Sequence, residues 1–338
     1  MSLRYQVMCI QPAIYTARNR ADVRKNVERI TDMIGEMVFL QHRRQETRGA
    51  GKVKLLAFPE YGFSDWRGIA SGTIDGLDVA IEIPGPEVEP LARAAKENQL
   101  YIAAQALEIL PQFPGHFLNA AFIFGPDGEL IYKRHKLRHG LLTLYTSPND
   151  VLDRYMAEFA NGRSVGNVVF PVVETDIGTL GMCVCHEIRT PEVARQLTAN
   201  GAEVIIRSTA EPELAGRVYL DRARAIENKV YWVVSNSGYS VENTTIGDMG
   251  ASRIIGFKGE IIAESYQADS TVWGEIDVEW LRTSRGPARL PLYASAVFDY
   301  HQRPSLPPNL FADGKPDRAT IESELIRLGL VPSVADKE

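Results

Sequence analysis

The sequence predicts an α/β sandwich built on a mixed sheet. Short apolar runs bounded by turn residues are typical of buried strands, and they alternate with segments of helical apolar spacing in the first half. In the second half, hairpin-like pairs of strands join this alternation, which favours a mixed sheet over a purely parallel one. We expect one domain over residues 1–285, because no linker or low-complexity stretch divides it.

The elements of the first half follow from these patterns in order. We expect a strand at residues 5–11 and then a helix at residues 21–41, whose apolar side chains recur every three or four positions. A second helix is expected at residues 86–98, after the Pro84-Gly85 break. Further strands are predicted at residues 54–58, 101–109, 120–124 and 130–132.

Strands and helices also alternate in the second half, and a proline-rich segment follows them. Strands are predicted at residues 168–173, 181–185, 204–207, 231–235, 252–257 and 271–276, with helices at residues 191–199 and 216–228. Residues 286–338 are rich in proline and show little periodicity before residues 319–328. We expect this extension to pack on the body or on a neighbouring subunit, with a flexible end as the alternative.

Composition and charge exclude several classes of protein. The formal charge of -6 and the lack of an extended basic tract argue against a nucleic-acid partner and favour small neutral or cationic ones. Three cysteines do not make a disulfide framework, which indicates a reducing compartment. We see no signal-peptide pattern and no apolar run of membrane-spanning length, so we expect a cytoplasmic protein without a membrane partner.

Three predicted strands end in residues with reactive side chains. Glu60 follows the strand in K-V-K-L-L-A-F-P-E, Lys136 follows the one in G-E-L-I-Y-K-R-H-K, and Cys185 ends the one in G-M-C-V-C. Hydrolysis of a carbon–nitrogen bond needs a nucleophile, a proton shuttle for the departing amine and a positive group for the oxyanion. A thiol, a carboxylate and an ammonium supply these roles if the three strand ends meet.

Each residue alone has an ordinary structural explanation. A carboxylate after a strand is commonly a cap or an ion-pair partner, a lysine in a basic run is commonly solvated, and a buried cysteine is commonly inert core. The three motifs become informative because they occur together and in a fixed order.

The motifs F-P-E-Y-G-F, G-E-L-I-Y-K-R-H-K-L and C-H-E-I-R-T-P-E resemble, in this order, the Glu-Lys-Cys signatures of the nitrilase (carbon–nitrogen hydrolase) superfamily. The resemblance extends from Tyr5 to about Leu281 and includes L-N-A-A-F-I-F-G-P-D-G-E and M-G-A-S-R-I-I-G-F-K-G-E-I. It implies a four-layer α-β-β-α sandwich, homo-oligomers and no cofactor. It also implies that Glu60 is the general base and acid, Lys136 the oxyanion stabiliser and Cys185 the nucleophile.

Two neighbouring residues offer alternatives to this assignment. Lys133 lies in the same basic run as Lys136, but an ungapped match from Gly128 places Lys136 on the family's catalytic lysine. Cys183 precedes Cys185 by two residues, so we expect it on the same face of the strand, packing behind the nucleophile. The C-x-C-H spacing is compatible with a metal, but no second ligand pair is evident, and we expect no metal site.

The family's second glutamate, which follows its lysine closely, has no plain counterpart here. The first acidic residues after Lys136 are Asp150, Asp153 and Glu158, all later than the family pattern. Either one of these folds back, or the position is filled by His139, Tyr145 or Asn149.

The residues after the nucleophile favour an amide substrate. Nitrilases typically continue with tryptophan and glutamate, whereas this chain continues with His186 and Glu187, so resemblance implies hydrolysis of a small aliphatic amide or formamide. The alternatives are an N-carbamoyl amide hydrolase, a nitrilase, and a non-catalytic binding member of the fold. Candidate substrate-binding residues are Tyr61, Trp66, His186 and Arg189, with Trp232 as either pocket wall or core and Arg189 as either substrate ligand or ion-pair partner of Glu187 or Glu192.

Overall fold

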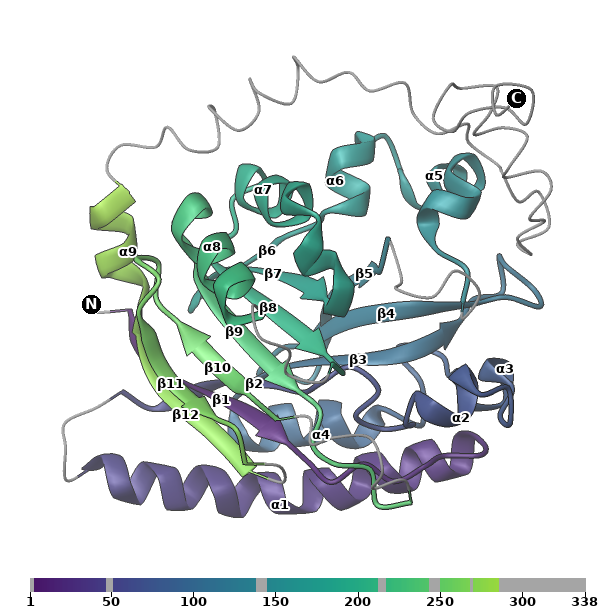
Figure 1. Ribbon diagram of the computed structural model, residues 1–338, viewed down its shortest axis with the longest axis horizontal. Helices are drawn as coiled ribbons and strands as arrows, with labels where there is room; N and C mark the ends of the chain where they lie inside the picture. Colours follow the sequence, from purple (N-terminus) through teal and green to yellow (C-terminus); the bar gives the residue numbers. More distant parts are fainter. Residues whose placement is uncertain are drawn as a thin grey trace, which may run out of the picture.

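Two sheets stacked face to face form the centre of the protein (Figure 1). The computed structural model describes residues 3–46, 51–137, 145–211, 217–242, 250–267 and 270–285. Within this described part each sheet has six strands, and helices cover both outer surfaces. The four-layer α-β-β-α sandwich implied by the resemblance is therefore confirmed. The predicted extension, residues 286–338, lies outside the described residues.

The first sheet carries two of the three reactive strand ends at one edge. Its strand order is β12-β1-β2-β3-β4-β5. Strands β1, β2 and β3 are parallel, and two antiparallel steps bring β5 back to the direction of β2. Glu60 after β2 and Lys136 after β5 thus leave the sheet at the same edge. The strands are β1 (Arg4–Gln11), β2 (Val53–Ala57), β3 (Tyr101–Ile109), β4 (Phe117–Phe124), β5 (Leu130–His135) and β12 (Ser270–Asp277).

The second sheet carries the thiol in the same way. Its order is β11-β10-β9-β8-β7-β6, and its three central strands β7, β8 and β9 are parallel, so their carboxyl ends lie together. Cys185 directly follows β7. The strands are β6 (Val173–Thr175), β7 (Gly178–Val184), β8 (Val204–Thr209), β9 (Tyr231–Asn236), β10 (Ser252–Ile255) and β11 (Ile261–Ser265).

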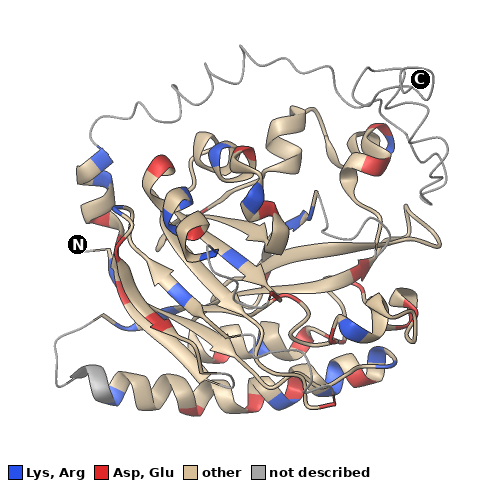
Figure 2. Ribbon diagram, viewed as in Figure 1, with Lys and Arg blue, Asp and Glu red and all other residues tan. Residues whose placement is uncertain are grey.

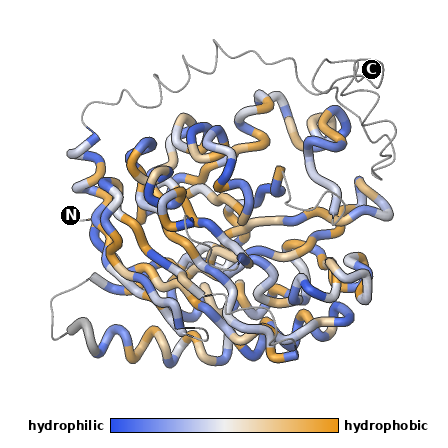
Figure 3. The backbone as a smooth tube through the Cα atoms, in the orientation of Figure 1, coloured by the Kyte–Doolittle hydropathy of each residue, from blue (hydrophilic) through white to orange (hydrophobic). Residues whose placement is uncertain are grey.

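Alternation along the strands divides the apolar side chains between three layers of core. In β2, Leu55 and Ala57 face the second sheet, while Leu56 faces the helices α1 (Arg20–Glu46) and α4 (Glu89–Asn98). The second sheet buries its outer face under α7 (Pro191–Ala199) and α8 (Arg217–Asn228) in the same way. Figure 3 shows the hydrophobic stretches along the strands, and Figure 2 shows both signs of charge along α1.

Shorter helices complete the described part of the chain. They are α2 (Arg67–Ala70), α3 (Gly76–Val79), α5 (Leu152–Phe159), α6 (Val165–Val169), α9 (Val278–Arg285) and the 3-10 turns η1 (Pro148–Val151) and η2 (Cys185–Arg189). None of the helices in these described ranges is both long and apolar enough to cross a lipid bilayer.

The structure differs from the residue patterns in two respects. The patterns alone indicated one mixed sheet, whereas the strands form the two sheets that the resemblance implied. The strand predicted at residues 168–173 is wrong, because residues 165–169 form α6 and β6 begins only at Val173. Ser164 caps this helix by accepting a hydrogen bond from the Asn167 backbone N–H, and a short apolar run does not by itself distinguish a helix from a strand.

Candidate active site

Glu60 and Lys136 meet in a buried ion pair at the edge of the first sheet. The Lys136 Nζ donates to Glu60 Oε1 at 2.8 Å, and both side chains are almost fully buried. Lys133, the alternative in the basic run, instead pairs with Glu108 Oε1 at 2.5 Å and donates to the Ile83 carbonyl. The two lysines lie on opposite faces of the strand end, so Lys136 alone faces Glu60.

A line of amides on the inner face of the first sheet holds the Glu60 carboxylate. Asn119 Nδ2 donates to Glu60 Oε1 at 2.8 Å, and Gln105 Nε2 donates to Asn119 Oδ1 at 2.9 Å. Gln105 Oε1 accepts from the backbone N–H of Tyr61, which has a left-handed φ of 55°. The sequence motifs did not point to Asn119 or Gln105. The signal was available, since each is a polar residue on the inward-facing positions of an otherwise apolar strand.

Cys185 stands where β7 ends, in a left-handed conformation with φ of 48°. This turn is held from behind by Arg207 Nε, which donates to the Cys185 carbonyl at 3.1 Å. A non-glycine residue in this region is sparsely populated and needs such support. The turn also aims the side chain: Cys185 packs with the residues between the two sheets, whereas Cys183 packs under α7 and α8.

The expectation that Cys183 lies on the same face as Cys185 is therefore wrong. The alternation of a strand would have placed them together, but the strand ends at Val184 and the left-handed turn reverses the direction of the next side chain.

The thiol lies within the electrostatic reach of the Glu60–Lys136 pair. Burial raises the pKa of Cys185 well above its usual range, Glu60 raises this pKa further, and Lys136 lowers it. Burial lowers the pKa of Lys136, but the neighbouring Glu60 and Tyr145 outweigh that effect and the net pKa is well above the usual value. In the free protein the lysine is thus a cation and the cysteine a neutral thiol at pH 7.

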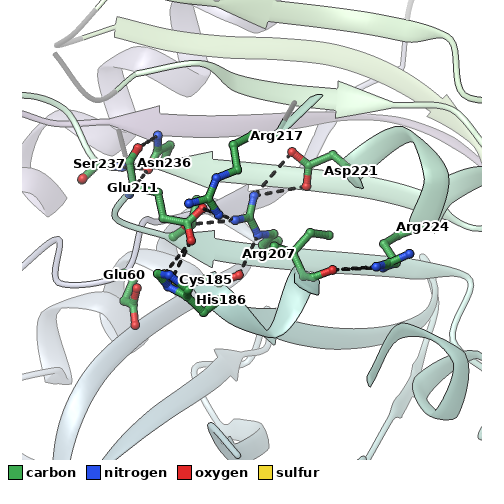
Figure 4. Close-up of polar contacts among 12 residues, drawn as sticks. Glu60, Cys185, His186, Arg207, Glu211, Arg217, Asp221, Arg224, Asn236 and Ser237 are labelled. Carbon is green, nitrogen blue, oxygen red and sulfur yellow. Dashed lines mark hydrogen bonds and ion pairs between the residues drawn. The ribbon is translucent and has the colours of Figure 1, made fainter. Parts of the chain in front are cut away.

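A second carboxylate contacts the sulfur from the other side (Figure 4). Cys185 Sγ donates to Glu211 Oε1 at 3.3 Å, and His186 Nδ1 lies 3.2 Å from both of these atoms. The other oxygen, Glu211 Oε2, lies 2.6 Å from Arg207 and 2.5 Å from Arg217. Glu211 was not among the predicted site residues, although it comes two residues after β8 and so follows a strand end as Cys185 does.

Cys185, His186 and Glu211 are also the candidate metal ligands in the described part of the chain. The donor atoms of Cys185, His186 and Glu211 all lie within 4.8 Å of one another. However, the Arg207 and Arg217 guanidiniums already neutralise the Glu211 carboxylate, and their charges oppose the binding of a cation there.

A buried clamp joins the strand ends that carry Lys136 and Cys185. Arg134, two residues before the lysine, makes a two-pronged ion pair with Glu187, two residues after the cysteine, at 2.7 and 2.8 Å. Glu187 also accepts from the backbone N–H groups of Leu137 and Val184, and Arg134 donates to the Met182 carbonyl. The possible ion pair of Arg189 with Glu187 is therefore not formed, since Arg134 takes this carboxylate.

The predicted substrate-binding residues fall into two groups. Tyr61 lies at the site, since Glu60, Lys136 and Cys185 all act on the pKa of its hydroxyl, which burial raises strongly. His186 contacts the sulfur. Arg189 is exposed at the end of η2, and Trp66 lines a different cavity of about 650 Å³ with Arg67 and Thr16. Trp232 is core: its side chain is fully buried and its Nε1 donates to Asp221.

Of the candidates for the missing second glutamate, Tyr145 comes to the site. Its ring lies 5.7 Å from Lys136 Nζ. Asp150 instead accepts from the backbone N–H of Ser147, and Asn149 donates to the Leu137 carbonyl. Asp153 and Glu158 are exposed on α5, and His139 lies outside the described residues.

Comparison with known proteins gives one family. The family model described as carbon-nitrogen hydrolase matches residues 7–285. The chain is 28% identical to omega-amidase NIT2 of Xenopus tropicalis over 235 residues, which cover 69% of this chain and 79% of that protein. It is 26% identical to a formamidase of Bacillus cereus over 262 residues, covering 76% of this chain and 69% of that protein. Over 225 residues it is 27% identical to nitrilase homolog 2 of Dictyostelium discoideum, covering 66% of this chain and 65% of that protein.

Solved structures show the same fold at lower identity. A carbon-nitrogen hydrolase from Helicobacter pylori superposes with a TM-score of 0.63 at 19% identity, covering 87% of this chain and 98% of that one. An amidase from Nesterenkonia superposes with a TM-score of 0.60 at 17% identity, covering 87% and 95% of the two chains.

Proposed function

This chain belongs to the carbon–nitrogen hydrolase family of the nitrilase superfamily, and we propose that it is an amidase. Its substrate is a linear carboxamide, a small aliphatic amide or a formamide, which it hydrolyses to a carboxylic acid and ammonia. The names of its distant relatives, omega-amidase and formamidase, support a carboxamide over a nitrile.

One observation carries this proposal: the ion pair of Glu60 and Lys136 lies beside the Cys185 thiol. The pair places a proton acceptor and a fixed cation at the nucleophile, which are the two groups that acyl transfer from nitrogen requires.

The reaction proceeds in two halves. Glu60 takes the thiol proton as Cys185 Sγ attacks the amide carbon, while Lys136 and the backbone N–H of His186 stabilise the oxyanion. Glu60 then returns the proton to the nitrogen, the carbon–nitrogen bond breaks and ammonia leaves, so that a thioester remains on Cys185. Water, activated by Glu60, cleaves the thioester and releases the acid.

His186 does not serve as the base of a Cys-His-Glu triad. In such a triad one ring nitrogen faces the nucleophile and the other faces the acid. Here the same nitrogen, Nδ1, faces both Cys185 and Glu211. Desolvation also lowers the pKa of His186, with Lys136 adding to this against the opposing Glu211, so the ring is a poor proton acceptor at pH 7.

The test is an ammonia-release screen across formamide, short aliphatic amides, carbamoyl amino acids and nitriles. We expect release from one or more short amides by the wild type, none by Cys185→Ala, and an acyl adduct on Cys185 by mass spectrometry. Cys183→Ala is the matched control, because Cys183 faces the opposite side of the sheet and should leave turnover unchanged. Turnover by Cys185→Ala near that of the wild type would reject the mechanism, and carbon dioxide release with ammonia would identify a carbamoyl substrate instead.

A further inference from the structure

Cys185 has carboxylates on two sides, and the mechanism above uses only one of them. Glu60 is held by Lys136 and Asn119, whereas Glu211 is held by Arg207 and Arg217. The side chain of Glu211 is only 5% exposed, and its backbone N–H is fixed by Asn236 Oδ1 at 3.0 Å. Its Oε1 is therefore a rigidly placed acceptor that points at the reacting sulfur (Figure 4).

Glu211 is suited to accept hydrogen bonds and not to carry protons. Burial opposes ionisation of its carboxyl, but Arg207, Arg217 and His186 outweigh this and hold its pKa below the usual range. It is therefore an ionised carboxylate at neutral pH.

Glu211 Oε1 loses its hydrogen bond from the Cys185 S–H during the reaction. The contact with Cys185 depends on the S–H proton, and this proton leaves when the sulfur attacks. A buried carboxylate oxygen that loses a donor is costly unless another donor replaces it. The amide nitrogen of the substrate is bonded to the carbon that the sulfur attacks, and its N–H groups are the donors that arrive at the same place and time.

We propose that Glu211 is a substrate-binding residue whose Oε1 accepts an N–H of the scissile carboxamide, so that the site selects amides over nitriles and esters, which lack this donor. The proposal rests on the amidase function above and adds a specificity determinant to it. Glu211 gives and takes no proton: the thiol proton still passes through Glu60 to the leaving nitrogen.

The test uses Glu211→Gln, which reverses the polarity of this contact. The glutamine oxygen must stay with the Arg207 and Arg217 donors, so its NH2 group is turned toward Sγ, where an acceptor stood before. We compare kcat/KM for propionamide with kcat/KM for p-nitrophenyl propionate, which delivers the same acyl group without an N–H. We expect the amide value to fall about 100-fold and the ester value to change by less than about threefold.

Equal losses on amide and ester, or no loss on the amide, would overturn the proposal. Glu60→Gln should lose both activities, and Glu264→Gln, whose carboxylate pairs with Arg253 away from the thiol, should keep both. If Glu211→Gln does not fold, Glu211→Asp keeps the charge that the arginines need and withdraws the acceptor from the sulfur. It should also lose amide activity selectively. Absence of amide turnover by the wild type would reject the amidase function itself, which is a separate outcome.

Discussion

At the scale of single residues, the two lysines of one basic run give a matched pair of variants. Lys136 Nζ lies 2.8 Å from Glu60, while Lys133 Nζ lies 2.5 Å from Glu108. We expect Lys136→Met to lower kcat on a carboxamide by about 10²- to 10³-fold, because an oxyanion donor is lost. Lys133→Met should lower the melting temperature but leave kcat within about threefold, since truncating it leaves Glu108 without one of its partners. Steady-state kinetics of both variants show which lysine is catalytic. An equal effect on kcat would contradict the assignment of Lys136.

The Cys185 thiol gives a prediction about pH. Burial raises its pKa, with Glu60 adding to this against Lys136, so the thiolate fraction at pH 7 is below that of a free cysteine. We expect the rate of its modification by methyl methanethiosulfonate to rise continuously with pH through the ordinary cysteine range near pH 8.5, with no plateau below it. Mass spectrometry of the Cys185 peptide against time measures this rate, and a plateau below pH 8 would indicate a preformed thiolate.

At the scale of elements, the clamp between Arg134 and Glu187 joins β5 of one sheet to η2 after β7 of the other. We expect Glu187→Gln to cost about 3–5 kcal/mol of unfolding free energy, because it leaves a buried guanidinium without its partner charge. The double variant Arg134→Met/Glu187→Leu should recover part of that stability, since both charges are removed, but the backbone N–H groups of Leu137 and Val184 still lose their acceptor.

The same double variant should still show reduced kcat, because the contact that joins the strand ends of Lys136 and Cys185 is lost. Denaturant unfolding and kinetics on the wild type, Glu187→Gln and the double variant separate the two effects. Full recovery of kcat together with stability would mean that the clamp has no role in positioning.

Sequence patterns locate elements better than they locate side chains. The strand at residues 101–109 and the helix at residues 191–199 were predicted with the observed bounds, because both have strong periodicity and clear breaks. The prediction that Cys183 and Cys185 share a face was wrong, because the left-handed turn at Cys185 does not show in the apolar pattern of the sequence. Glu211 was missed because what distinguishes it, the contacts with Arg207 and Arg217, joins residues on separate elements and exists only in three dimensions.

At the scale of the whole molecule, the site exists because two sheets bring their strand ends to one place. The three strand ends were predictable from the residue patterns, but the assignment of each strand to one of the two sheets was not, since strand pairing is set by contacts distant in sequence. Hydroxyl groups tie the sheets together at separate points. Ser208 Oγ on β8 donates to the Phe58 carbonyl at 2.8 Å, and the Tyr231 hydroxyl on β9 donates to the Asp277 carbonyl at 3.0 Å.

These two contacts allow stability and catalysis to be separated. Phe58 lies two residues before Glu60, and Ser208 lies three residues before Glu211, so their hydrogen bond fixes the spacing between the two carboxylates. Tyr231 binds at the opposite end of the parallel strands. We expect Ser208→Ala to cost about 1–3 kcal/mol of unfolding free energy, because it leaves a buried carbonyl without a donor, and Tyr231→Phe to cost about 0.5–1.5 kcal/mol. Only Ser208→Ala should also lower kcat, and unfolding curves with amide kinetics on both variants measure this. If Tyr231→Phe lowered kcat as much as Ser208→Ala does for each kcal/mol of unfolding free energy lost, catalysis would depend on the general rigidity of the sandwich. It would then not depend on the local spacing of its strand ends.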